Sequence, residues 1–182
     1  MIIIALGANL PSPRYGTPLA TLKAALAALE SREITVAKVS RWYETAPVPV
    51  SDQPWYVNGA ARLETSLGAA DLLARLHEIE AEFGRVRAEV NAPRVLDLDL
   101  IAHGNLVLGR ELGEVSSPTA VRPVVPHPRL HERAFVLLPL RDVTPDWVHP
   151  VLGLTAGEMI AALPPGQATR LIGEEPAGGG ED

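Results

Sequence analysis

The stretch Val95-Leu96-Asp97-Leu98-Asp99-Leu100-Ile101 alternates apolar and acidic side chains, and this alternation predicts a β-strand. Successive side chains of a strand point to opposite faces, so the three leucines share one face and the two aspartates share the other. Two carboxylates on one face lie about 6.6 Å apart and repel each other unless a cation lies between them. A divalent ion with oxygen ligands, Mg²⁺ above all, would satisfy both carboxylates. The alternative is a solvated face of a half-buried strand.

Periodic segments on either side of this strand predict alternating strands and helices. One helix follows a Thr17 cap and Pro18, and a second has a buried stripe that ends at Gly84. The order βαββαβ with antiparallel pairing predicts a ferredoxin-like two-layer α/β (α+β) sandwich, with helices packed on a mainly antiparallel sheet. Residues 135–140 are compatible with a strand or with the start of a helix. The predicted strands are 2–6, 34–43, 55–65 and 95–101, and the predicted helices are 18–30, 69–83 and 155–163.

The composition of the 182 residues excludes several classes of protein. The 16 basic and 22 acidic residues give a net charge of −6, which argues against a general nucleic-acid binder. Cysteine is absent, so disulfides and thiolate metal sites are excluded. The longest apolar run has 7 residues (134–140), whereas a membrane helix needs ~18, and no secretory leader is visible. We therefore expect a cytoplasmic protein that binds neither nucleic acid nor membrane.

Arginines surround the two aspartates. Of the 16 basic residues 14 are arginines, and neither lysine follows a glycine, so a P-loop is excluded. A planar guanidinium binds two phosphate oxygens at once, while carboxylates hold the metal that neutralises the remaining charge. Each arginine alone is better explained as a surface salt bridge, but six beside one pair of aspartates indicate phosphate binding. These six are Arg85, Arg87, Arg94, Arg122, Arg129 and Arg133.

Several segments together resemble one known family. The stretch 93–101 resembles the signature of hydroxymethyl-dihydropterin pyrophosphokinase, a folate-pathway enzyme family. The resemblance covers roughly residues 2 to 164, so we expect a pyrophosphokinase domain over 1–164 and a C-terminal extension over 165–182. From 173 onward the extension holds four acidic residues, four glycines and no basic residue, which is typical of disorder. The other matching segments are Gly7-Ala8-Asn9-Leu10, Tyr43-Glu44-Thr45-Ala46-Pro47, Gln53-Pro54-Trp55-Tyr56-Val57-Asn58, Gly84-Arg85-Val86-Arg87 and Val125 through Phe135.

The resemblance implies a diphosphate transfer from ATP to the hydroxymethyl group of 6-hydroxymethyl-7,8-dihydropterin, with release of AMP. It implies that Asp97 and Asp99 hold two Mg²⁺ ions and that Arg85 and Arg94 are further catalytic residues. Glu80 matches a carboxylate of the nucleotide site, although a charge on the helix surface is an equal alternative. The positions that match ATP contacts are Glu80, Arg85, Arg87, Arg94, Leu100, Arg122, Val124, His127 and Arg133.

The resemblance also places the pterin between the rings of Tyr56 and Phe135. Asn58 lies two residues after Tyr56 and shares its face of a strand, so its amide can bind the pterin edge. The alternative is that the two rings belong to the core and Asn58 to a turn. The positions that match pterin contacts are Asn9, Thr45, Ala46, Val48, Tyr56, Asn58 and Phe135.

Two segments depart from the family pattern. The loop 88–92 is shorter than in well-known members, and 110–120 is an insertion.

The alternative function is a non-catalytic ferredoxin-like binding module, such as an RNA-recognition domain. That module needs a basic sheet face with stacked aromatic residues. The charge of −6 and the paired aspartates favour the enzyme, whose partners would be the small molecules ATP and a reduced pterin.

Overall fold

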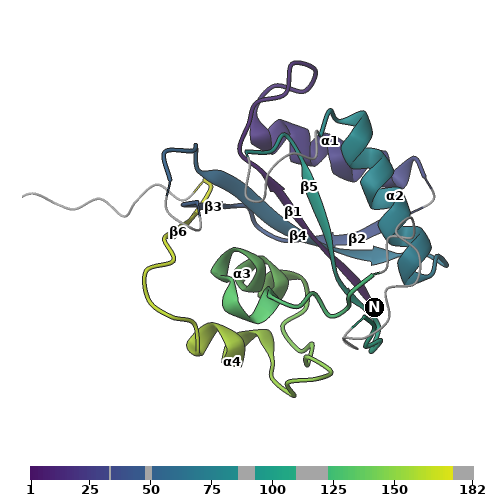
Figure 1. Ribbon diagram of the computed structural model, residues 1–182, viewed down its shortest axis with the longest axis vertical. Helices are drawn as coiled ribbons and strands as arrows, with labels where there is room; N and C mark the ends of the chain where they lie inside the picture. Colours follow the sequence, from purple (N-terminus) through teal and green to yellow (C-terminus); the bar gives the residue numbers. More distant parts are fainter. Residues whose placement is uncertain (33, 48–50, 86–92, 110–122, 174–182) are drawn as a thin grey trace, which may run out of the picture.

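The computed structural model describes residues 1–32, 34–47, 51–85, 93–109 and 123–173. One antiparallel sheet has the strand order β5-β1-β4-β3-β6, and β2 pairs with β4 beside this path. Helices pack on this sheet (Figure 1), so the predicted antiparallel α+β fold is confirmed. The strands are β1 (Ile2–Ala8), β2 (Thr35–Val39), β3 (Tyr43–Thr45), β4 (Tyr56–Glu64), β5 (Asp97–His103) and β6 (Thr169–Leu171). The helices are α1 (Pro18–Glu30), α2 (Ala69–Glu82), α3 (Ala134–Val143) and α4 (Ala156–Ala161), with a 3₁₀ turn at Leu130–Glu132.

Two apolar clusters lie on opposite faces of the sheet. Ile4 of β1 packs against α1 and α2, whereas its neighbour Ile3 packs against α3 and α4, which explains why β1 is apolar along its length. Figure 1 shows α1 and α2 on one side of the sheet and α3 and α4 on the other. The leucines at 96, 98 and 100 belong to the α1–α2 cluster. Asp97 and Asp99 therefore face the side of the sheet that carries α3.

The strand expected over 34–43 is divided into β2 and β3. Ser40 lies between them, and its hydroxyl accepts a hydrogen bond from the Ala60 N–H at 2.9 Å, which a backbone carbonyl would accept in a regular ladder. The ring of Trp42 then packs on Gly59, where a Cβ would come within 2.5 Å of the ring. A glycine at this position of β4 is thus required by a neighbouring side chain.

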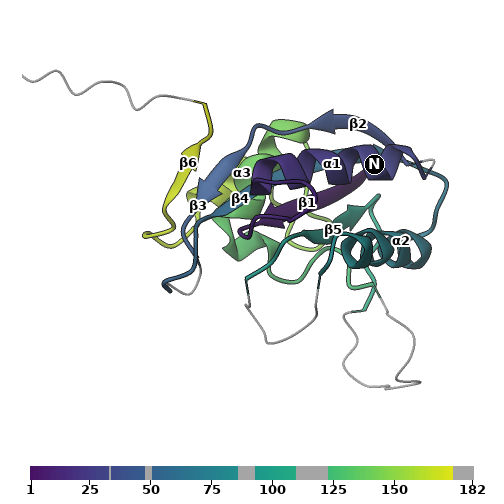
Figure 2. The ribbon, with the colours of Figure 1, turned by 90° about the horizontal axis from the view of Figure 1, so that it is seen from above.

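The C-terminal third resolves one open alternative and adds one strand. Residues 135–140 are helical, within α3, and the helix expected over 155–163 is α4, with a capping box between Thr155 and Glu158. After α4 the chain returns to the sheet as β6, which pairs with β3. Figure 2 shows β6 and β5 at opposite edges of the sheet. Part of the segment expected to lie beyond the domain therefore belongs to its sheet.

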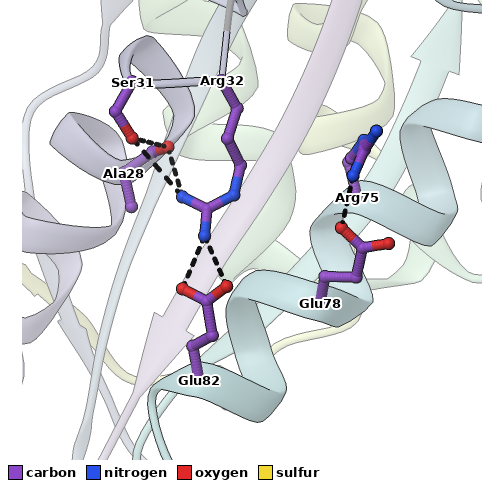
Figure 3. A network of polar contacts seen from close by, with 6 residues as sticks. All are labelled: Ala28, Ser31, Arg32, Arg75, Glu78 and Glu82. Atoms are coloured by element: carbon purple, nitrogen blue, oxygen red, sulfur yellow. Dashed lines mark hydrogen bonds and ion pairs between the residues drawn. The ribbon is translucent and has the colours of Figure 1, made fainter.

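Polar contacts join the ends of α1 and α2 at the surface (Figure 3). One guanidinium nitrogen of Arg32 donates to the Ala28 carbonyl at 2.9 Å, and the other donates to both carboxylate oxygens of Glu82 at 2.5 Å. The Glu82 side chain is 55% exposed, so solvent screens this pair and it contributes little beyond orienting the two helix ends.

Several positions singled out by sequence cannot be placed. Val48, Arg87 and Arg122 lie outside the described residues, as do the segments 88–92 and 110–120 and the chain from 174 onward. Across the ranges that the structure describes, none of the helices is both long enough and apolar enough to cross a membrane.

Candidate active site

Two adjoining hollows share Asp99 in their lining: the larger lies on the α3 side of the sheet, and the smaller lies at the β5 edge, where Leu73 of α2 and Leu100 of β5 line it. The larger hollow has a volume of about 370 Å³ and the smaller about 260 Å³. The larger is bounded by the ends of β1, β3, β4 and β5, by the loop after β3 and by the start of α3. Its lining comprises Gly7, Thr45, Ala46, Pro47, Ser51, Gln53, Tyr56, Asn58, Arg94, Asp97, Asp99, Arg129, Glu132, Arg133, Phe135, Pro164 and Gln167. The smaller is lined by Leu73, Asp99, Leu100, Pro123, Val124, Val125, His127 and Pro128.

The sheet supplies the floor of the larger hollow. In register, Gly7 of β1 lies between Asn58 of β4 and Asp97 of β5, and Ala5 lies opposite Asp99. A Cβ on Gly7 would come 3.1 Å from the Asn58 side-chain oxygen, so a larger residue would crowd this row. Small residues in β1 therefore leave room above the sheet between the amide and the carboxylates.

The two aspartates have different surroundings. Asp97 forms ion pairs with Arg85 and Arg94. The pKa of Asp99 is raised to about 6, first by burial and then by the negative charge of Asp97. A cation between the two groups would favour the ionised form of Asp99 and relieve its repulsion with Asp97. Among the described residues no three His, Asp or Glu side chains converge, so a metal ion here would draw its other ligands from substrate and water.

Glu80 lies behind this pair and not on the helix surface. It is 1% exposed, forms an ion pair with Arg85 and accepts a hydrogen bond from the Leu98 N–H at 2.7 Å. One buried carboxylate thus ties α2 to β5 and holds the guanidinium beside Asp97. The alternative of a solvated surface charge is wrong, because the helix face that carries Glu80 packs against β5.

We expect Glu80→Gln to lower kcat about tenfold. The amide can still accept the Leu98 N–H, but it lacks the negative charge that holds Arg85 in place. Steady-state turnover together with thermal unfolding checks this. Glu78→Gln on the exposed side of the same helix is the control, since Glu78 pairs with Arg75 at the surface (Figure 3) and should leave kcat unchanged. An unaltered kcat in Glu80→Gln would contradict the assignment.

The polar edge of the larger hollow is built from buried side chains. The Asn58 amide donates to the Thr45 hydroxyl at 2.7 Å, and the two residues are 6% and 3% exposed. Asn58 is in β4 and not in a turn, and Tyr56 and Phe135 both line the hollow. Burial raises the pKa of Tyr56, whose hydroxyl donates to Gln53 at 3.2 Å. The lining of the hollow thus combines two aromatic side chains with a buried amide.

Asn9 supports this hollow without lining it. Its side-chain oxygen accepts from the Arg94 N–H at 2.7 Å, and its amide donates to Gln53 and to the Pro54 carbonyl at 3.3 and 3.2 Å. The side chain is 2% exposed. It therefore fixes the loop before β4 against the residues that lead into β5.

The smaller hollow is more apolar and contains a neutral histidine. Burial, and after it the charge of Arg133, lowers the pKa of His127 to about 4, so the imidazole is uncharged at neutral pH. Burial likewise lowers the pKa of Arg133, ahead of the effect of Arg129. Leu100 and Val124, which match ATP contacts by resemblance, both belong to this lining.

Three residues of the larger hollow, Ser51, Pro164 and Gln167, have no counterpart among the segments and sites that the sequence predicted. Pro164 and Gln167 come from the C-terminal segment, which no motif singled out. Pro164 and Gln167 reach the hollow because the chain returns from α4 to the edge of the sheet as β6. No local sequence pattern predicts such a long-range contact.

Comparison with known proteins gives one consistent family. The family model for 7,8-dihydro-6-hydroxymethylpterin-pyrophosphokinase matches residues 3–145. A pyrophosphokinase of this name from Pseudomonas aeruginosa is 40% identical over 164 residues, 90% of this chain and 91% of that one. The relative from Synechocystis is 38% identical over 159 residues, 87% of this chain and 73% of that one. The folic acid synthesis protein fol1 of Pneumocystis carinii is 36% identical over 154 residues, 85% of this chain but 19% of that one.

A solved structure agrees on the fold. The HPPK-DHPS triple mutant from Plasmodium falciparum superposes with a TM-score of 0.66 at 13% identity, covering 88% of this chain and 44% of that one. At this identity the likeness concerns the fold alone. The family match extends over most of the chain and includes the two aspartates, Glu80 and the aromatic residues of the larger hollow. The chain therefore belongs to the 7,8-dihydro-6-hydroxymethylpterin-pyrophosphokinase family.

Proposed function

We propose that this chain transfers the diphosphate of ATP to the hydroxymethyl group of 6-hydroxymethyl-7,8-dihydropterin and releases AMP, as a step of folate biosynthesis. One observation carries the assignment of the site: Asp99 lines both hollows. A pterin in the larger hollow and a nucleotide reaching into the smaller one would meet at this carboxylate. The names of the relatives from Pseudomonas and Synechocystis support the same activity.

The donor set suits two Mg²⁺ ions. Asp97 and Asp99 offer hard carboxylate oxygens on one face of β5. Magnesium is typically bound by one or two carboxylates together with substrate phosphates and water, which fits a site with two acidic side chains. When bound, the ions would neutralise the charge on the β- and γ-phosphate oxygens.

Arginines would take the remaining phosphate charge. Arg85 and Arg94 pair with Asp97, and Arg133 at the start of α3 lines the same hollow as Arg94 and Asp97. Guanidinium groups on two sides of the transferring group stabilise charge that spreads over its oxygens as the bond breaks. We assign Arg85 and Arg94 to the transfer, and Arg133 to phosphate binding. Arg87 and Arg122 remain predicted contacts.

The two substrates would occupy separate hollows. Leu100, Val124 and His127 line the smaller one, which we assign to the base and ribose of ATP. We assign the larger hollow to the pterin, with Tyr56 and Phe135 against its faces and Asn58 at its edge. Thr45, Ala46, Val48 and Asn9 complete the proposed pterin site, Asn9 through the loop that it fixes.

The reaction balances as a single displacement. The pterin hydroxyl oxygen forms a bond to the β-phosphorus of ATP, and the bond from that phosphorus to the α–β bridging oxygen breaks. AMP leaves with the bridging oxygen, and the hydroxyl proton passes to solvent. The protein forms no covalent bond to either substrate in this displacement. Much of the acceleration would therefore come from holding the hydroxyl and the phosphorus in line.

Turnover should depend on both Mg²⁺ and the pterin. With ATP and hydroxymethyl-dihydropterin we expect AMP formation in the presence of Mg²⁺ and its loss on chelation, with recovery when Mg²⁺ is restored. Omitting the pterin should stop AMP formation as well. Chromatographic assay of the nucleotides checks both. Equal AMP formation with the ion chelated would contradict the metal assignment, and a folded protein that forms no AMP would contradict the proposed activity.

A further inference from the structure

The C-terminal segment 164–172 forms part of the wall of the larger hollow, although it lies beyond the residues 3–145 that match the family model. Pro164 and Gln167 line the hollow. Directly after them, β6 pairs with β3, with Thr169 opposite Thr45, and the Ala46 N–H donates to the Ala168 carbonyl at 3.2 Å. The segment is therefore fixed to the strand from which the loop of the hollow departs.

Gln167 bridges two backbone groups at the start of α3. Its side-chain oxygen accepts from the Ala134 N–H at 2.8 Å, and its side-chain nitrogen donates to the Glu132 carbonyl at 2.9 Å. Arg133, the residue between these groups, makes no side-chain cap of its own. The first N–H groups of a helix lack partners within the helix, so Gln167 supplies a cap from a distant part of the chain.

The capped helix start carries two side chains of the hollow. Arg133 and Phe135 both line it, and the Arg133 guanidinium lies 5.4 Å from the centre of the Phe135 ring. Tyr56 lines the hollow from β4, which is hydrogen-bonded to β3. Gln167 thus connects β3 and β6 with the start of α3, the helix that carries Phe135.

We propose that Gln167 is a positioning residue of the pterin subsite. It fixes the start of α3 relative to β3 and β6, so that Phe135 and Arg133 face the hollow at the separation that a flat heterocycle requires. The inference rests on the proposed function, since it assigns the larger hollow to the pterin. It assigns to the C-terminal segment a role in substrate binding.

Gln167→Met tests this, because methionine has a side chain of similar length but cannot form either of the two hydrogen bonds. We expect the Kd of the pterin, measured by calorimetry with a non-hydrolysable ATP analogue present, to rise about tenfold. The kcat/KM for the pterin should fall by a similar factor. Gln167→Glu keeps the acceptor for the Ala134 N–H but loses the donor to the Glu132 carbonyl, so its Kd should lie between those of the wild type and Gln167→Met.

Val143→Ala provides a control of matched stability. Val143 is 1% exposed at the other end of α3, so this variant should lower the Tm while the pterin Kd stays unchanged. An unchanged Kd in Gln167→Met overturns the proposal, and so does an equal rise in Val143→Ala, because either result leaves Gln167 no role beyond stability. A wild-type protein that binds no pterin in the same titration would instead refute the proposed function.

Discussion

Replacing Asp97 by Ala should lower kcat by roughly 10³-fold at saturating Mg²⁺ and ATP. The change removes a proposed metal ligand and, in the same place, the ion-pair partner of Arg85 and Arg94. Asp99→Ala should have an effect of similar size, because this carboxylate lines both hollows. Steady-state assays of AMP formation measure both variants, and circular dichroism establishes that the fold is retained.

Asp97→Asn separates the charge from the shape of the side chain. The amide preserves the size of the side chain but cannot supply the negative charge that a metal ion and two guanidinium groups require. We therefore expect Asp97→Asn to be nearly as impaired as Asp97→Ala. Asp71→Asn, in the exposed first turn of α2, removes a carboxylate elsewhere and should leave turnover unchanged. Turnover of Asp97→Ala near that of the wild type would exclude the metal assignment.

Replacing Asn58 by Ala should weaken pterin binding by about 1–3 kcal/mol, or roughly 5- to 150-fold in Kd. Asn58 is buried between Thr45 and the glycine of β1, so its loss leaves the polar edge of a bound pterin without a partner. Phe135→Ala should also raise the Kd, since it removes one aromatic face of the hollow. Calorimetric titration of the pterin, with a non-hydrolysable ATP analogue present, measures both.

Trp55→Ala is the control for these two variants. Trp55 precedes Tyr56 in the chain, is 42% exposed, and its ring lies 4.9 Å from the Arg170 guanidinium and not in the lining of the hollow. Its loss should leave the pterin Kd unchanged. If Asn58→Ala and Phe135→Ala bind pterin as tightly as the wild type does, the pterin site lies elsewhere.

The parts of the fold that sequence predicted are those with a strong local period. The Thr17 cap of α1, the buried stripe of α2 and the alternation around Asp97 each depend on residues within one element or next to it, and all three are confirmed. The division between β2 and β3 was missed because it depends on a hydrogen bond from Ala60 to the Ser40 side chain, across strands. The apolar run of α3 also suits a strand, and only its packing on the sheet decides between helix and strand.

The site follows the same division between local and long-range signals. The aspartates are two residues apart in one strand, and sequence placed them on one face. Glu80 could not be distinguished from a surface charge, because its burial depends on β5 packing against its helix. Gln167 acts through backbone groups more than thirty residues earlier in the chain, so neither its position nor its neighbours identify it.

The proposed reaction transfers a diphosphate from ATP to the pterin, and the transfer takes place at Asp97 and Asp99. ATP labelled with ³²P at the β-phosphorus tests this most directly, in a reaction with hydroxymethyl-dihydropterin and Mg²⁺. We predict that the label moves to the pterin product in equal amount to the AMP formed, and that Asp97→Ala abolishes the transfer. Label that remains on the nucleotide as ADP would contradict the account, because it would mean that only the γ-phosphoryl group moves.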